Sequence, residues 1–227
     1  MTYASILQGL LNDEYQDIRV LNYGFSGATL PRLVERIEQS EVKEDDLVIA
    51  YIGINEAAHL MIAKSTAISK LFRLIPKYGE LISVLAQKSL VAEWLKSATV
   101  KQLWEINSDG RINFENGLTR LVEFCNKSDA SLVLVLQPSL FTKKVASSYE
   151  IELLKQVNLN FYRLMKACYE EIEEILRAKI GQKVFFNSAI TLMDSCKISP
   201  YIDTFHVDDS GNQQIAECIF DLVKRLR

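Results

Sequence analysis

The chain has 227 residues, of which 48% are hydrophobic, and its formal net charge is −3. This size suits one α/β domain over residues 1–227 with a sizeable core. The charge argues against the broad basic field that attracts nucleic acid, so no nucleic-acid partner is expected. The four cysteines contain no CxxC pair, which argues against a zinc or disulfide framework. With neither a signal peptide nor a transmembrane run visible, a cytoplasmic location is expected.

The first half of the chain alternates between helical and strand-like patterns. Apolar residues at helical spacing predict a helix over residues 4–14, and residues 18–23 predict a strand. The next helix begins near residue 30 and accommodates Pro31 in its first turn. The nearly continuous apolar run at 47–52 is typical of a strand that is covered on both faces.

The second half continues this alternation. A helix precedes a strand at 131–136, a long helix covers about 149–179, a strand covers 183–187, and a last helix begins near Ser210. Alternating strands and helices predict a three-layer, flavodoxin-like α/β fold, in which a parallel sheet carries helices on both faces.

A stretch at about 60–104 interrupts this order and is too long for a simple connection. It has apolar residues at helical spacing, seven Lys or Arg residues and two Glu residues. These features predict a basic helical insert. The insert either packs its apolar face on the core or forms a cap that touches an anionic or acyl substrate, or a lipid or membrane surface.

Three short motifs lie where an open α/β sheet carries functional groups, at the carboxyl ends of strands. They are Asn-Tyr-Gly-Phe-Ser-Gly at 22–27, Gly-Ile-Asn-Glu at 53–56 and Asp-Thr-Phe-His at 203–206. Taken singly, each motif is also compatible with an ordinary turn or a helix start. Their order and placement together favour a catalytic site.

Each motif supplies a distinct chemical group. Gly27 lets a backbone N–H approach a substrate oxygen, and the Asn55 amide offers a second donor, so the two are candidates for an oxyanion hole. Asp203 is placed to orient His206 as a general base. His59 is expected to have a structural role, either starting the insert helix or filling a polar gap. These motifs imply neither a metal nor an organic cofactor.

In this combination the sequence resembles the SGNH (GDSL-type) hydrolase family. The motifs at 22–27, 53–56 and 203–206 are similar to the family's second, third and fifth blocks, and the resemblance runs from about Tyr3 to the C-terminus. It implies a serine hydrolase that acts on carboxylic esters, with catalytic residues Gly27, Asn55, Asp203 and His206. Glu56 stands where the family usually has Asp.

The family's first block, Gly-Asp-Ser, which carries the nucleophile, is absent from the chain. Asp194-Ser195 and Asp209-Ser210 are the only Asp-Ser pairs, and neither occupies the family's position. The resemblance therefore implies a nucleophilic serine upstream of this chain. We expect a natural protein longer by one strand and a loop, on the order of 20–30 residues.

Several functions fit these observations. The first is hydrolysis of a small acyl ester, an acetylated sugar or a lipid ester, with O-acyl transfer as a close variant. The second is an inactive relative that binds a ligand in the same cleft. The third is an unrelated nucleotide-binding domain, against which the absence of GxGxxG and P-loop motifs argues. The partner expected for the first is a small-molecule ester, and the sequence does not fix the oligomeric state.

Overall fold

The computed structural model describes residues 1–63, 104–157 and 159–226. Its main sheet has three parallel strands in the order β1-β4-β5, namely β1 (Leu47–Ile52), β4 (Ser131–Leu136) and β5 (Val184–Ser188). The pattern-based prediction of these strands is confirmed to within one residue. The predicted mixed fold, with a parallel sheet between helices, is also confirmed.

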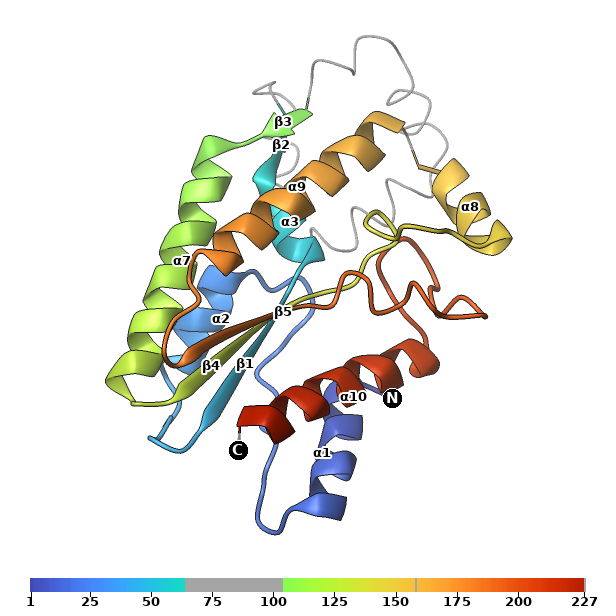
Figure 1. Ribbon diagram of the computed structural model, residues 1–227. Helices are drawn as coiled ribbons and strands as arrows, with labels where there is room; N and C mark the ends of the chain where they lie inside the picture. The colour runs from blue at the N-terminus through green and yellow to red at the C-terminus, as the bar shows by residue number, and fades with distance from the viewer. Residues whose placement is uncertain (64–103, 158, 227) are drawn as a thin grey trace.

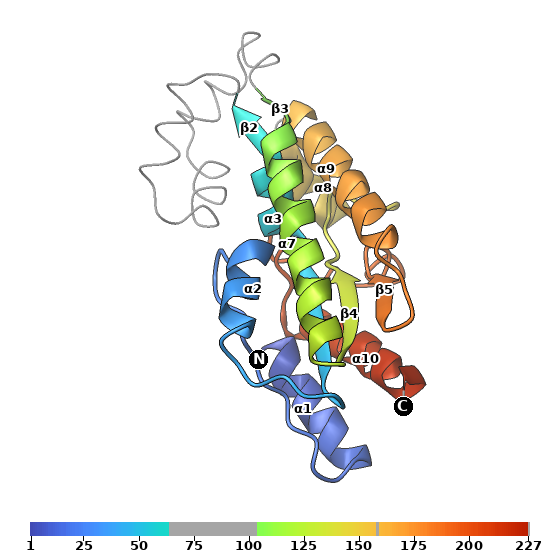
Figure 2. The ribbon, with the colours of Figure 1, turned by 90° about the vertical axis from the view of Figure 1, so that its left-hand side faces the viewer.

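Side chains alternate between two apolar layers because successive residues of a strand point to opposite faces. On one face, Leu132, Leu134 and Leu136 pack with α2 (Leu30–Ile37), α3 (Ile54–Leu60), α7 (Ser108–Lys127) and α9 (Leu159–Arg177). On the other face, Val133 and Val135 pack with α1 (Tyr3–Glu14) and α10 (Asp209–Leu226). Figures 1 and 2 show α1 and α10 together on their side of the sheet.

The prediction of a strand at residues 18–23 is wrong, because this segment has no regular structure. The side chain of Gln8 takes the place of a neighbouring strand. Its amide nitrogen donates to the Ile18 carbonyl at 2.9 Å, and its oxygen accepts from Val20 N–H at 2.6 Å. Among the described residues, none pairs with the outer edge of β1. The segment therefore lacks the ladder partner that would make it a strand.

The long helix predicted at 149–179 is also wrong in detail, since two helices, α8 (Ser148–Lys155) and α9, cover this region. The last turn of α8 tightens into two i→i−3 hydrogen bonds, from Gln156 N–H to Leu153 and from Val157 N–H to Leu154. Because the helix breaks there, α8 can bury Glu150 against Lys143, at an Oε1–Nζ distance of 2.6 Å, while α9 packs on the sheet.

Most of the predicted insert at about 60–104 lies outside the described residues. The helices predicted for it, and its predicted cap or lipid contact, therefore lie outside them as well. Its two ends are described. Strands β2 (Met61–Ala63) and β3 (Trp104–Ile106) pair in an antiparallel fashion, so the insert leaves and re-enters the fold at one place. This pair follows α3 directly and lies beside α9 (Figure 1).

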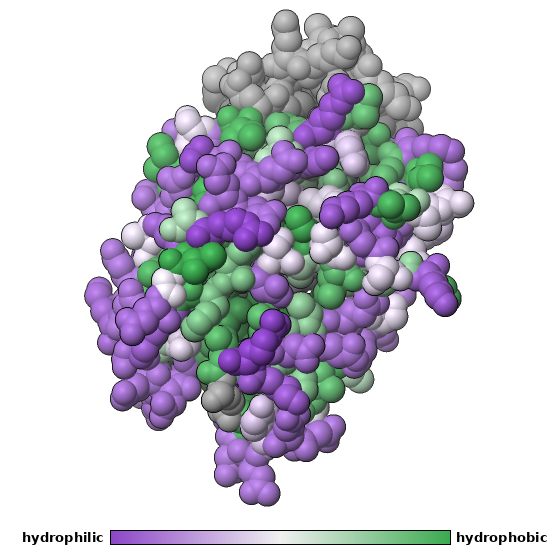
Figure 3. Space-filling view, viewed as in Figure 1, coloured by the Kyte–Doolittle hydropathy of each residue, from purple (hydrophilic) through white to green (hydrophobic). Residues whose placement is uncertain are grey.

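No helix within the described ranges is long and apolar enough to cross a bilayer. The face of the molecule in Figure 3 mixes hydrophilic and hydrophobic residues.

Candidate active site

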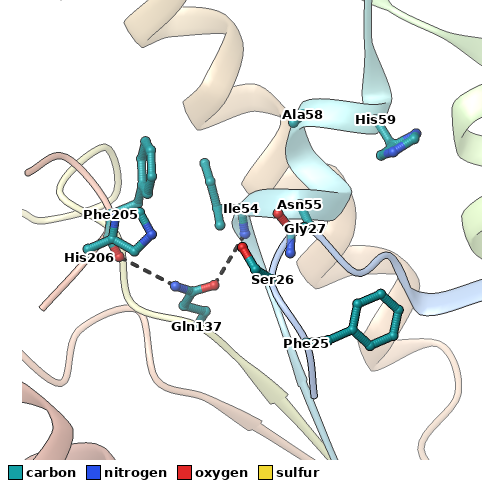
Figure 4. Close-up of a pocket in the computed structure, with 10 residues that line it drawn as sticks. All are labelled: Phe25, Ser26, Gly27, Ile54, Asn55, Ala58, His59, Gln137, Phe205 and His206. Atoms are coloured by element: carbon teal, nitrogen blue, oxygen red, sulfur yellow. Dashed lines mark hydrogen bonds between the residues drawn. The ribbon is translucent and has the colours of Figure 1, made fainter. Parts of the chain in front are cut away.

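A pocket of about 260 Å³ opens at the carboxyl ends of β1 and β4, where the three sequence motifs meet. Helix α3 starts directly after β1 and supplies one wall. The turn before α2 and the loop before α10 supply the others, and Figure 4 shows their side chains around the cavity. The lining residues are Phe25, Ser26, Gly27, Ile54, Asn55, Ala58, His59, Gln137, Phe205 and His206.

One side of the pocket is the loop that carries Asp203 and His206. The Asp203 carboxylate contacts His206 Nδ1 at 2.7 Å, and its other oxygen accepts the backbone N–H groups of Phe205 and His206 at 2.9 and 2.8 Å. The carboxylate therefore fixes both the loop and the ring, and the second ring nitrogen remains available as a base. Asp203 itself lies behind His206, outside the pocket lining.

The electrostatics of this pair suit a general base. The hydrogen bond that His206 Nδ1–H donates to Asp203 raises the pKa of His206 above its ordinary value, and partial burial only reduces that effect. Burial acts to raise the pKa of Asp203, but its hydrogen bonds from His206 and Phe205 outweigh burial and lower it. At neutral pH the carboxylate is therefore ionised and stabilises an imidazolium that forms beside it.

Two motifs meet on the opposite side of the pocket. Gly27 lies in the turn before α2 with φ of +70°, a conformation that favours glycine. A Cβ at this position would meet no atom within 4 Å, so the backbone angle rather than space requires glycine here. Asn55, in the first turn of α3, donates from Nδ2 to the Ala28 carbonyl at 2.8 Å. This bond holds the Asn55 amide beside the Gly27 turn.

Glu56 is a buried carboxyl group beneath these donors, with 4% of its surface exposed. One oxygen accepts from Leu30 N–H at 2.8 Å and the other from Gly53 N–H at 3.1 Å. Burial raises the pKa of Glu56 to about 7, although the backbone hydrogen bonds lower it. Sequence reasoning treated Glu56 only as a mild departure from the family pattern and missed its position between two helix starts.

Gln137, which directly follows β4, connects the two sides of the pocket. Its Oε1 accepts from Ile54 N–H at 3.3 Å, and its Nε2 donates to the Phe205 carbonyl at 3.4 Å (Figure 4). A Cβ on Gly53 would lie 2.5 Å from Gln137 Cβ, so glycine is needed at position 53 for this close approach. Sequence reasoning missed Gln137. A polar residue directly after a buried central strand is the signal that could have found it.

His59 does not start an insert helix, because it lies in the last turn of α3, where it lines the pocket. The alternative, that His59 fills a polar gap, stays a prediction. Burial, and secondarily the charge of Arg32, lowers the pKa of His59. Ser26 is the one hydroxyl-bearing side chain among the described lining residues. The structure thus brings Gly27, Asn55 and His206 to one pocket, with Asp203 supporting His206.

The chain matches no protein-family model, and no curated protein matches its sequence. Among solved structures, it is similar in fold to an acetyl xylan esterase, with a TM-score of 0.55 and 13% sequence identity. The superposition covers 98% of this chain and 90% of the esterase. At this identity the likeness shows the fold alone, an α/β fold shared with that esterase.

Proposed function

We propose that this protein hydrolyses carboxylic esters by the serine mechanism of SGNH-type enzymes. The observation that carries the proposal is that His206, Gly27 and Asn55 line one pocket, with Asp203 hydrogen-bonded to His206, in a fold shared with an esterase. The pocket lies at the carboxyl ends of parallel strands, where α/β enzymes carry their active sites.

In the proposed reaction, a serine hydroxyl attacks the ester carbonyl, and His206 Nε2 takes its proton. The Asp203 carboxylate stabilises the resulting imidazolium. The tetrahedral oxyanion accepts hydrogen bonds from Gly27 N–H and Asn55 Nδ2. His206 then gives the proton to the leaving alcohol, and water, deprotonated by the same imidazole, releases the acid from the acyl-enzyme.

The proposed nucleophile is a serine upstream of Tyr3, on a strand that pairs with the outer edge of β1. Two observations support this placement. No described residue pairs with that edge, and residues 18–23, which have a strand-like sequence, form no ladder with any described strand. An added strand would satisfy the backbone N–H and C=O groups of β1, and its carboxyl end would lie near Gly53, beside the pocket.

The proposed substrate has a small acyl group. The space of about 260 Å³ among the described residues accommodates an acetyl-sized group. The fold relative is an acetyl xylan esterase, so acetylated sugars are the class to test first. Transfer of the acyl group to a sugar hydroxyl, instead of water, uses the same residues and is the second candidate.

The test compares the 227-residue chain with an extended protein, in which the codons that lie in frame directly upstream of Met1 are also translated. We expect the extended protein to hydrolyse p-nitrophenyl acetate and His206→Gln to lower the rate about 10³- to 10⁴-fold. The control is His59→Gln, which replaces the other histidine of the pocket and should change the rate by less than about tenfold.

Labelling with a fluorophosphonate, followed by peptide mapping, identifies the nucleophile. We expect the label on a serine upstream of Tyr3. A label on Ser26 would overturn the proposed location of the nucleophile. An extended protein that neither hydrolyses the ester nor takes the label would overturn the enzyme proposal and favour a binding protein.

A further inference from the structure

Glu56 joins two helix starts that are distant in sequence. Thr29, the N-cap residue of α2, makes no side-chain capping hydrogen bond. The N–H of the next residue, Leu30, instead donates to Glu56 Oε1 from α3. Glu56 Oε2 accepts the N–H of Gly53, at the start of its own helix. One buried carboxylate thus satisfies orphan donors of both α2 and α3.

We propose that Glu56 is a positioning residue that sets the distance between the two oxyanion donors, Gly27 and Asn55. This inference rests on the proposed ester hydrolysis and deepens it. Glu56 does not line the pocket, so it acts through the backbone that it holds.

Glu56 is connected to both donors through a few residues of chain and a single hydrogen bond. Gly27 is three residues before Leu30, within a turn that is attached to α3 at two points. These points are Leu30 N–H on Glu56 and the Ala28 carbonyl on Asn55 Nδ2. Asn55 immediately precedes Glu56, so movement of the carboxylate changes the positions of both donors together. A displacement of about 1 Å at a reacting centre is enough to lower a rate roughly 10²-fold.

The contacts require an acceptor at both oxygens. The ionised carboxylate, which predominates above the Glu56 pKa of about 7, meets this requirement, whereas a glutamine presents one oxygen and one NH₂ group. Glu56→Gln therefore turns the NH₂ group toward either Leu30 N–H or Gly53 N–H and leaves that donor without its acceptor. Glu56→Asp keeps two acceptors on a shorter side chain, so it restores part of what glutamine loses.

The kinetic test uses the extended protein and p-nitrophenyl acetate. We expect Glu56→Gln to lower kcat about 10- to 100-fold with less than about a twofold change in KM, and Glu56→Asp to give an intermediate kcat. Asn55→Ala is the reference for direct loss of a donor, with a decrease of about 10²- to 10³-fold in kcat. Val34→Ala, a buried truncation on α2, controls for lost stability and should leave kcat within about twofold.

A second readout is independent of activity. In ¹⁵N NMR spectra, Glu56→Gln should shift the resonances of the Asn55 side-chain amide and the Gly27 backbone amide. It should also speed hydrogen exchange at the backbone amide of Leu30 or Gly53. Val34→Ala should cause neither change. Unmoved Gly27 and Asn55 resonances would overturn the positioning role even if no ester is hydrolysed. Ester hydrolysis with an unchanged kcat in Glu56→Gln would also overturn it, while the proposed function would stand.

Discussion

The two sides of the pocket are held in different ways. Asp203 and His206 are three residues apart on one loop, and their side chains are 39% and 59% exposed. The oxyanion side is assembled from segments 26 residues apart, through the buried Glu56 and its 2.8 Å bond from Leu30. One side of the pocket therefore depends on a solvent-exposed contact between residues close in sequence, and the other side on a buried contact between residues distant in sequence.

This difference predicts different responses to mutation. Changes in the base loop should affect chemistry with little loss of stability, because exposed side chains contribute little to folding. Changes on the oxyanion side should affect chemistry and folding together, because the same backbone turn carries the donor and joins two helices.

The largest effect is expected for Asp203→Asn in the extended protein. Asparagine cannot hold His206 in the tautomer that accepts a proton, so kcat should fall about 10³- to 10⁴-fold with little change in Tm. The matched control is Asp208→Asn, because Asp208 accepts Gly211 N–H at 3.0 Å as a helix cap and asparagine caps equally well. A loss of less than tenfold in Asp203→Asn would show that the base is not oriented by this carboxylate.

A smaller effect is expected from pH. His206 acts as a base only when neutral, and its hydrogen bond with Asp203 raises its pKa. The value of kcat/KM should therefore rise with pH through a midpoint above that of an ordinary histidine, falling about tenfold for each pH unit below it. The midpoint should move to lower pH in Asp203→Asn and stay unchanged in Glu56→Gln. A midpoint that moves in Glu56→Gln but not in Asp203→Asn would assign the transition to Glu56.

The same shift links His206 to stability. Because the pKa of His206 is raised in the folded state, His206 contributes fully to the free energy of unfolding below its pKa in the unfolded chain. This contribution is lost as the pH rises through its pKa in the folded protein.

The smallest effect is expected for Gly27→Ala. The space around Gly27 is open, so the substitution meets only the strain of a positive φ, about 1–2 kcal/mol of unfolding free energy. The control is Gly9→Ala on the exposed face of α1, which should stabilise the protein by about 0.5–1 kcal/mol. Urea denaturation measures both. A Gly27→Ala variant as stable as the parent would show that the turn adopts another conformation in solution.

Features that depend on local pattern can be predicted from the amino-acid sequence alone. The apolar runs at 47–52 and 131–136 predicted strands because residues buried on both faces of a parallel sheet are nearly all apolar. The Asp203–His206 contact was predictable because it spans three residues of one loop. The position of Asn55 at the edge of the sheet was predictable because it comes shortly after the apolar strand 47–52.

Tertiary packing determines which of these patterns find hydrogen-bonding partners. Residues 18–23 have a strand-like composition but are not a strand, because strand formation needs a neighbouring ladder and Gln8 satisfies the local backbone groups instead. The roles of Glu56 and Gln137 depend on contacts across 26 and 68 residues of sequence. Such contacts follow from how helices pack on the sheet, and no local periodicity encodes that packing.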